Sequence, residues 1–381
     1  MPDIYRELID AFEKRKIAYT REFIPFFISS VATHMFNLTN KNKPVYTEGG
    51  GAVVDTRQHV LFVAPPGWGK TYLLRQFLES EVYSILKKTT IQSQFMTGKV
   101  TEAGFIGTIK EDQKSGQVKK IYGYAHKHSN AILGCEEFSA VTRSFIQEYN
   151  VGLDTAILTA LDTGLVGKTL GAGTLEYTTN LTLWAGTQPA RYDLGSGFAR
   201  RFIFLVFNPT WNDEMEFRRR RRESKNLQTN QVQLKMLRDM MDQRMTEIKN
   251  VTGIQFTTDF YKEMDKLNVM HYEEALYERL AIGYWMMKNN KLYGTVQIYI
   301  DEELKRIIEL EKQHRKKAKR GTQQYHVEAI LKEKGKVDSD EVYDLLADFG
   351  IDPNTAKACL NGLMTSGKIK RDGSNLLPVA R

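Results

Sequence analysis

Continuous apolar runs alternate with helical periods over the first half of the chain. Each run is long enough for a buried strand and contains few polar residues. The runs are VLFVA (60–64), AILGC (131–135), LTLWAG (181–186) and FIFLVF (202–207). Strands of this kind, separated by helices, indicate a parallel sheet that is covered on both faces. The pattern therefore predicts an α/β fold.

The segments around this sheet are mainly helical in pattern. Residues 1–40 predict amphipathic helices, with Pro25 breaking or kinking the second, and residues 37–58 form a polar, glycine-rich connection. From 208 to 318 only helical periodicity is found, and 312–324 reads as a basic, glycine-containing linker. The expected units are a core with N-terminal helices (1–207), a helical lid (208–318), and a basic linker with a last unit (319–381).

Residues 325–381 have the pattern of a small separate unit. One helical period ends at Gly335 and a second at Gly350, and Pro353 stands in the first turn of a third. The stretch IKRDGSNLLPV (369–379) reads as two short strands around an Asp-Gly turn. Three helices and a hairpin predict a winged helix-turn-helix.

The third helix and the wing of this unit are expected to contact DNA phosphates, which would give a salt-dependent affinity. The candidate residues are Asn354, Thr355, Lys357 and Asn361 along the helix, and Lys368, Lys370 and Arg371 on the wing. The alternative is a winged helix that docks on a protein. The second helix is a poor phosphate binder because it carries Asp338, Asp340, Glu341 and Asp344.

Composition narrows the class of protein and of partner. The chain has 381 residues, enough for two or three domains, and its formal charge of +8 favours a polyanionic partner. Its two cysteines argue against a disulfide framework or a zinc module and favour a reducing compartment. The N-terminus has no apolar signal core, and residues 23–36 are too short to span a bilayer. We therefore expect a soluble, cytoplasmic protein without a membrane partner.

The stretch LFVAPPGWGKTYLLRQFL (61–78) predicts a phosphate-binding loop between a strand and a helix. Glycines let backbone N–H groups surround phosphates, the helix N-terminus favours the same anion, the lysine neutralises the β- and γ-phosphates, and the threonine hydroxyl binds Mg²⁺. The expected ATP-binding residues are Ala64, Pro65, Pro66, Gly67, Trp68, Gly69, Lys70 and Thr71, with alanine where the first glycine is usual. The alternative is a strand–turn–helix with a surface lysine.

A second carboxylate site follows the run 131–135. Glu136 is expected to contact Mg²⁺, through water, and Glu137 to polarise the attacking water. The more usual pair is Asp-Glu, so Glu136 is a departure whose side chain is one methylene longer. The alternative is a solvated helix N-terminus whose acids interact with the helix dipole.

The order of these motifs resembles the AAA+ ATPases, and in particular the ATPase core of the minichromosome maintenance (MCM) helicases. Residues 101–138 look like the MCM stretch with a helical insertion ahead of the acidic strand, and 153–193 like its helix, pre-sensor-1 hairpin and sensor-1 strand. GFARRFIF (197–204) looks like its arginine-finger segment and 275–290 like its lid helix. The resemblance covers roughly residues 45–310. It implies a P-loop AAA+ parallel sheet sandwiched by helices and followed by a helical lid, after which comes the C-terminal winged helix-turn-helix predicted from residues 325–381.

The resemblance also implies roles for individual residues. Gln188 would be sensor 1, where the family usually has asparagine, and Arg279 would be sensor 2. Arg201 would be the arginine finger that acts on a neighbouring subunit's nucleotide, with Arg200 as the second choice. Lys168, near the hairpin tip, would contact DNA.

The function implied is an ATP-dependent DNA motor, a helicase or translocase, that assembles as a homo-oligomeric ring, expected to be a hexamer, with ATP and Mg²⁺ between subunits. A separate initiator or adaptor protein is a further partner that this function allows. One alternative is a remodeller of protein complexes that resembles the MoxR-type AAA+ proteins, with the winged helix as an adaptor. Another is a DNA-bound switch that hydrolyses ATP slowly or not at all.

Five adjacent arginines, 218–222, follow the last core strand. Adjacent positions on a helix spread around its whole circumference, so the five cannot form one stripe. A solvated face or an intersubunit contact is one interpretation, and a nucleic-acid contact is the other.

Overall fold

The computed structural model describes most of the chain. The described residues are 4–14, 20–39, 45–46, 56–78, 84–96, 100–111, 117–144, 152–188, 200–207, 211–224, 230–290, 292–348 and 353–379.

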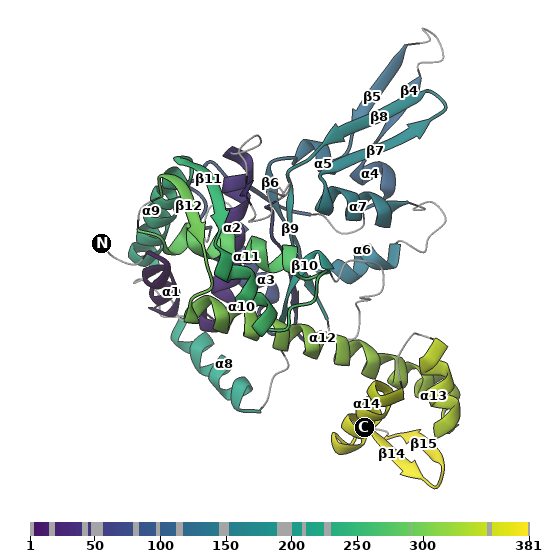
Figure 1. Cartoon of the computed structure of the whole chain (residues 1–381). Coiled ribbons are helices and arrows are strands. Elements are labelled where there is room, and N and C mark those ends of the chain that lie inside the picture. The colour runs from purple at the N-terminus through teal and green to yellow at the C-terminus, as the bar shows by residue number, and fades with distance from the viewer. Residues whose placement is uncertain are drawn as a thin grey trace.

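A five-stranded parallel sheet forms the centre of the fold, in the order β10-β2-β9-β6-β3 (Figure 1). Its strands are β2 (His59–Val63), β3 (Gln92–Phe95), β6 (Ala131–Cys135), β9 (Thr182–Thr187) and β10 (Phe202–Val206). Val60 and Phe62 of β2 face one apolar core, and Leu61 and Val63 face the other. The α/β fold with a parallel sheet between helices is confirmed, and β3 is a strand that the apolar pattern did not indicate.

Helices cover both faces of this sheet. One core packs against α1 (Ile4–Lys14), α2 (Thr20–Thr39), α3 (Lys70–Leu78) and α11 (Glu274–Lys288), and the other against α6 (Phe138–Ser144) and α7 (Leu153–Asp162). A side chain at Gly283 of α11 would overlap the Ser29 carbonyl oxygen, 2.3 Å from the position of a Cβ atom. Glycine at this point therefore allows the close crossing of α2 and α11. Pro25 lies inside α2, which continues through it.

The region 208–318 is not purely helical, although the sequence pattern predicted that it would be. Its helices are α8 (Trp211–Ser224), α9 (Asn230–Ile248), α10 (Thr258–Lys266), α11 and the start of α12 (Glu302–Lys334). Between them lie β11 (Val251–Phe256) and β12 (Gly294–Ile298), which form a second parallel sheet with β1 (Val45–Tyr46). These strands mix buried with exposed residues, so they do not form the continuous apolar runs that identified the strands of the main sheet.

The expected linker 312–324 is part of α12, which begins after the N-cap Asp301 and ends before Gly335. Two charged residues of this helix close the edge of the main sheet. The Glu311 carboxylate accepts the backbone N–H of Phe204 at 3.0 Å, and the Arg315 guanidinium donates to the Phe202 carbonyl at 2.8 Å. Because an edge strand leaves backbone groups unpaired, these contacts supply partners that a further strand would otherwise provide.

The end of α12 forms a separate apolar cluster with the C-terminal elements. These are β13 (Val337–Asp338), α13 (Ser339–Asp348), α14 (Pro353–Thr365), β14 (Ile369–Asp372) and β15 (Asn375–Pro378). The strands form an antiparallel sheet in the order β13-β15-β14. The cluster begins at Val327, close to the boundary expected from the sequence at 325.

Two antiparallel hairpins project from one end of the main sheet as a single arm (Figure 1). One is formed by β4 (Gly107–Glu111) and β5 (Val118–Tyr122), and the other by β7 (Leu165–Leu170) and β8 (Gly173–Thr178). The one-turn helices α4 (Glu102–Phe105) and α5 (Tyr124–Lys127) flank the first hairpin. The expected helical insertion within 101–138 is therefore mainly a β-hairpin, because GTIKE and VKKIY form paired strands.

Among the described residues, no helix is long and apolar enough to cross a bilayer.

Candidate functional site

The predicted phosphate-binding loop lies at the carboxyl end of β2 and leads directly into α3. Gly67 and Gly69 have positive φ angles of 83° and 75°, a conformation that side chains with a Cβ atom disfavour. A pocket of about 430 Å³ is lined by residues 67–72 and by Arg75. All eight residues expected to bind ATP, Ala64 to Thr71, belong to this strand–loop–helix unit.

The Lys70 side chain is mostly buried and folds across the loop. Its Nζ donates to the carbonyl oxygens of Ala64 at 2.6 Å and Pro65 at 3.0 Å. Burial lowers the pKa of Lys70, and the nearby Glu137 carboxylate opposes that shift. The ammonium group therefore has loop carbonyls as hydrogen-bond partners and is also influenced by the charge of Glu137.

Glu137 and Gln188 meet at the carboxyl ends of β6 and β9. Gln188 Nε2 donates to Glu137 Oε2 at 3.0 Å, and the Ser139 hydroxyl donates to Glu137 Oε1 at 2.5 Å. Both carboxylate oxygens of Glu137 are therefore held in place. The structure thus brings together two residues that were identified from different motifs.

Glu136 and Glu137 have different hydrogen-bond partners. It is half exposed, and its Oε1 atom accepts from the Arg75 guanidinium at 3.3 Å. Arg75 was not predicted as a site residue, although it lies on α3 and lines the pocket next to Lys70 and Thr71. Thr71 is the second residue of α3 and lines the same pocket.

An aromatic cluster covers the outer side of the loop. The Trp68 ring lies 5.3 Å from the Phe207 ring, just after β10, and 5.2 Å from the Phe217 ring of α8. A Cβ atom at Gly69 would be 3.5 Å from Phe217, so α8 packs on the loop itself. Nothing in the sequence pattern indicated this contact, because Phe217 is far from the loop along the chain.

Acidic side chains neutralise much of the arginine run at the end of α8. The ion pairs are Arg218 with Glu214, Arg219 with Glu216 and Glu223, and Arg220 with Glu216 and with Glu13 of α1. Within α8, each of these carboxylates is three or four residues from the arginine that it contacts, which is the spacing of neighbours on a helix surface. These pairs agree with the interpretation of the run as a solvated face.

Arg201 lies at the opposite end of the strands from the phosphate-binding loop. It precedes β10, whose first residue Phe202 pairs with His59 at the start of β2. The Arg201 side chain is only 7% exposed, and its Nη2 donates to the Asp162 carboxylate at 2.8 Å. A finger that acts on a neighbouring subunit would project from the subunit edge, and Arg201 does not, whereas Arg200 beside it is exposed.

Arg279 is close enough to Arg201 for its charge to act on that residue. It is a buried residue of α11. Burial lowers the pKa of Arg201 most, and the positive charges of Arg200 and Arg279 lower it further, against the raising effect of Asp162. The predicted finger and the predicted sensor 2 are therefore near one another.

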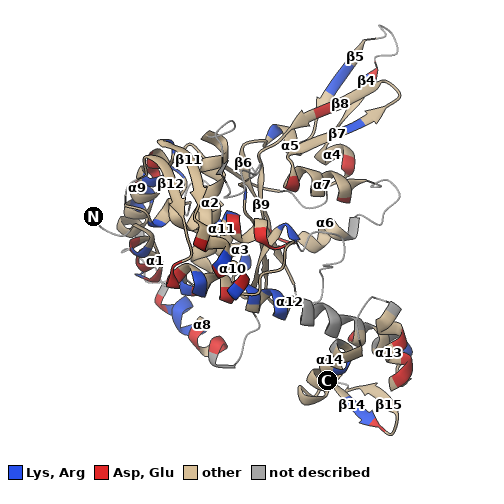
Figure 2. Cartoon of the chain, in the orientation of Figure 1, with Lys and Arg blue, Asp and Glu red and all other residues tan. Residues whose placement is uncertain are grey.

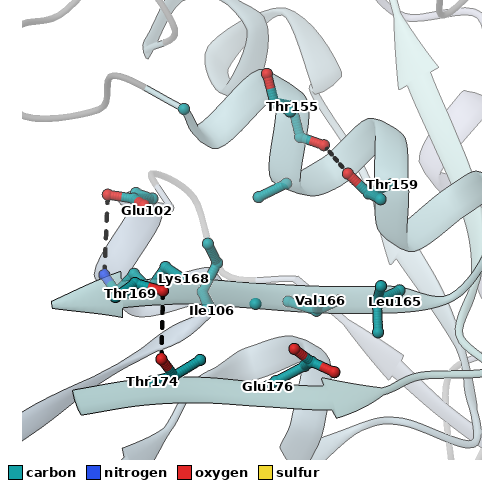
Figure 3. A pocket seen from close by; sticks show the side chains of 13 residues that line it. Glu102, Ile106, Thr155, Thr159, Leu165, Val166, Lys168, Thr169, Thr174 and Glu176 are labelled. Carbon is teal, nitrogen blue, oxygen red and sulfur yellow. Dashed lines mark hydrogen bonds and ion pairs between the residues drawn. The ribbon is translucent and has the colours of Figure 1, made fainter.

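Lys168 lies on β7, whose last residue Leu170 pairs with Gly173 across the turn of the hairpin (Figure 3). Its side chain is 13% exposed, and Nζ lies 3.8 Å from the Glu102 carboxylate of α4. Both residues line a cavity of about 530 Å³ between α4, α7 and the hairpin, together with hydroxyl groups such as those of Thr155 and Thr174. Lys168 is therefore turned toward the interior of the arm.

Exposed lysines occur instead on the other hairpin, where sequence reasoning did not place a site. Lys110 of β4 lies directly opposite Lys119 of β5, and Lys120 follows. All three are exposed, and within the described part of the chain no ion pair involves them. Like charges at facing positions destabilise a hairpin, and an anion bound between the two lysines would relieve that repulsion.

Some of the candidate DNA-binding residues of the C-terminal unit are exposed, and others contact an acidic or polar side chain. Asn354, Lys357 and Asn361 lie on the exposed face of α14, and the side chain of Thr355 is outside the described residues. In and just before β14, Lys370 is exposed, whereas Lys368 pairs with Glu328 and Arg371 donates to the Ser339 hydroxyl. Figure 2 shows acidic residues on the neighbouring α13.

No protein-family model matches this chain, and no curated protein matches its sequence.

Proposed function

We propose that the chain is an AAA+ ATPase of the MCM kind, which hydrolyses ATP at the interfaces of a ring and uses this hydrolysis to move DNA. The observation that carries the proposal is the convergence of Lys70, Glu137 and Gln188 at the carboxyl ends of β2, β6 and β9. The sheet order supports it as well, because β9 lies between the strand of the phosphate-binding loop and the acidic strand, so that Gln188 follows the strand between them.

The residues present fit Mg²⁺-ATP. Two glycines with positive φ line an open pocket at a helix N-terminus, which is the arrangement that accepts phosphates. Residues 64–71 would hold the phosphates, and the Thr71 hydroxyl and Glu136 would hold Mg²⁺, with water and phosphate oxygens completing its coordination. ATP would supply the phosphoanhydride bond that is hydrolysed, and Mg²⁺ would neutralise part of the negative charge of its phosphates.

The side chains around the pocket have separate tasks in this proposal. Glu137 orients and polarises a water molecule, and Gln188 and Ser139 keep its carboxylate fixed for that task. Lys70 exchanges its loop carbonyls for phosphate oxygens when ATP binds, which gains a charge-assisted contact. Arg75 orients Glu136 toward the pocket edge.

A complete site needs a second subunit. Arg201 and the loop lie at opposite ends of β10 and β2, which are separated by roughly 15–20 Å of strand. An arginine side chain cannot cover that distance, so Arg201, with Arg200 and Arg279 nearby, would act on the nucleotide of a neighbour in a ring, expected to be a hexamer. The projecting arm, with Lys110, Lys119 and Lys120, would contact DNA in the channel, and Lys168 would support it from within.

The test is ATP hydrolysis measured with and without single-stranded and duplex DNA. Wild type is expected to hydrolyse ATP, with stimulation by DNA. Lys70→Ala should abolish hydrolysis and weaken ATP binding, whereas Glu137→Gln should bind ATP and retain it. A Lys70→Ala variant that hydrolyses ATP like wild type would rule out the phosphate-binding role of residues 64–71.

A second candidate function is a MoxR-like remodeller of protein complexes that uses its C-terminal unit, a winged helix in this proposal, as a protein adaptor. The observation that favours it is the self-neutralised charge of that unit, where Lys334 pairs with Glu341, Lys336 with Asp372 and Lys368 with Glu328.

Truncation at residue 325 separates the two candidates, because it removes the whole C-terminal apolar cluster and keeps the residues that cap β10. For the DNA motor, the truncated chain should bind DNA more weakly, with a flatter slope of log affinity against log salt. An unchanged affinity and slope, together with ATP hydrolysis indifferent to DNA, would favour the remodeller.

A further inference from the structure

The ion pair between Arg201 and Asp162 joins the predicted finger to the hairpin arm. Asp162 is the last residue of α7, and β7 begins at Leu165. The guanidinium-bearing side chain is 7% exposed and the carboxylate-bearing one 43% exposed, so the arginine is held on the inner side of the pair. In this state Arg201 is turned into its own subunit.

The position of Asp162 on its helix indicates a specific role. An acidic side chain in the last turn of a helix faces the negative end of the helix dipole, which is unfavourable. The α7 helix carries this acid and no basic residue in its last turn. The contact with Arg201 offsets that cost, because the guanidinium neutralises the carboxylate at a distance of 2.8 Å.

The same turn is the base of the β7/β8 hairpin. The Gly164 carbonyl accepts the backbone N–H of Thr179 at 2.7 Å, which joins the two ends of the hairpin. Arg57 donates to the carbonyls of Thr179 and Leu181, and His59 contacts the Leu161 carbonyl at 2.9 Å. The hairpin base is therefore fixed to the start of β2 on one side and to Arg201 on the other.

We propose that Asp162 is a positioning residue that retains Arg201 inside its own subunit until the triphosphate of a neighbouring subunit competes for the guanidinium. Transfer of Arg201 to the phosphate frees the end of α7 and with it one anchor of the hairpin arm. The pair thereby couples the state of the neighbour's nucleotide to the arm. This inference rests on the proposed role of Arg201 as a finger that acts on another subunit.

Retention limits activity to the fraction of subunits in which Arg201 is released. Removing the charge of Asp162 should therefore raise the rate of ATP hydrolysis. The experiment compares wild type, Asp162→Asn, Asp162→Ser and Asp162→Glu at equal protein concentration without DNA. The control is Asp154→Asn, which removes a carboxylate from the first turn of the same helix, away from Arg201.

The two charge-removing variants are expected to hydrolyse ATP roughly three to ten times faster than wild type. Asp162→Glu, which keeps the charge, and Asp154→Asn should stay near the wild-type rate. The stimulation by DNA should shrink in the fast variants, because the arm no longer controls the finger.

A folded Asp162→Asn or Asp162→Ser protein that hydrolyses ATP no faster than wild type would overturn retention. Loss of folding in both variants would also overturn it, because the pair would then be a structural ion pair. The Arg201→Ala variant distinguishes failure of the retention proposal from failure of the proposed function. If Arg201→Ala retains wild-type hydrolysis, or if wild type hydrolyses no ATP, the finger assignment itself fails.

Discussion

At the scale of single residues, the sequence pattern located candidate site residues that are neighbours in the chain. The strand–loop–helix around residues 64–71 and the two acids at the end of β6 could be located from the sequence, because each is contiguous in the chain. Their partners could not be predicted in the same way. Arg75 contacts Glu136 and Asp162 contacts Arg201 across tens of residues, and only the folded chain brings them together.

His314 is a residue whose environment predicts a measurable pH dependence of stability. It is buried on α12 with its ring 5.4 Å from that of Phe23. Burial and the Lys317 charge lower its pKa to about 4, against the opposing effect of the Val206 backbone. The folded state thus binds a proton less readily than the unfolded state, whose histidine titrates near 6.5.

The stabilising contribution of neutral His314 is present above pH 6.5 and is lost as the pH falls toward 4. The free energy of unfolding should fall by up to about 1.4 kcal/mol per pH unit in this window on account of His314 alone. Urea unfolding between pH 4.5 and 7 should show a shallower decline for His314→Phe than for wild type. The control is His271→Phe, which changes an exposed histidine. If the free energy of unfolding falls equally steeply with pH in wild type and in His314→Phe, the argument is contradicted.

At the scale of elements, continuous apolar runs were predicted well and partly exposed strands were not. Strands β2, β6, β9 and β10 are buried on both faces, so their composition alone identifies them. The strands of the second sheet and of the β4/β5 hairpin are partly exposed, and the pairing partner stabilises them more than their own composition does. The glycine at 321 did not interrupt α12, because packing on β10 and on the C-terminal cluster supports the helix on both sides of it.

The lysines of the β4/β5 hairpin give a prediction at this scale. Changing Lys110 and Lys119 together to glutamine removes two facing charges that repel each other, so the hairpin should be unchanged or more stable. If the arm binds DNA phosphates, the affinity should fall in the double variant. The slope of log affinity against log salt should also flatten, by about 0.7–0.9 for each lysine that neutralises a phosphate in wild type.

The matched control for these lysines is a double change on α10, Lys262 and Lys266 to glutamine, which also removes two exposed charges. Fluorescence anisotropy titrations over a salt series supply both affinity and slope. An arm variant that behaves like the α10 control would place the DNA contact elsewhere.

At the scale of the whole molecule, the sheet separates two groups of charged side chains. The loop, Glu137 and Gln188 lie at the carboxyl ends of the strands, whereas Arg201 and the base of the hairpin arm lie at the start of β10, β2 and β9. Helix α12 spans from the edge of this sheet to the C-terminal cluster. In the proposed function, one subunit therefore presents a nucleotide-binding side and an arginine side, which is the arrangement that a head-to-tail ring requires.

This separation predicts complementation between two inactive variants. Arg201→Ala should bind ATP normally yet be nearly inactive, since a finger arginine contributes on the order of a thousandfold or more to phosphoryl transfer. Lys70→Ala should be inactive because its own phosphate site is damaged. In a mixed ring, some interfaces combine the intact loop of the Arg201→Ala subunit with the intact arginine of the Lys70→Ala subunit, and hydrolysis should partly return at those interfaces.

The measurement is the hydrolysis rate at a series of mixing ratios, with subunit exchange verified by labelled subunits and assembly by size. If rings that contain both variants show no recovery of ATP hydrolysis, the site is not shared between subunits. If Arg201→Ala alone keeps full activity, the exposed Arg200 should be tested as the finger instead.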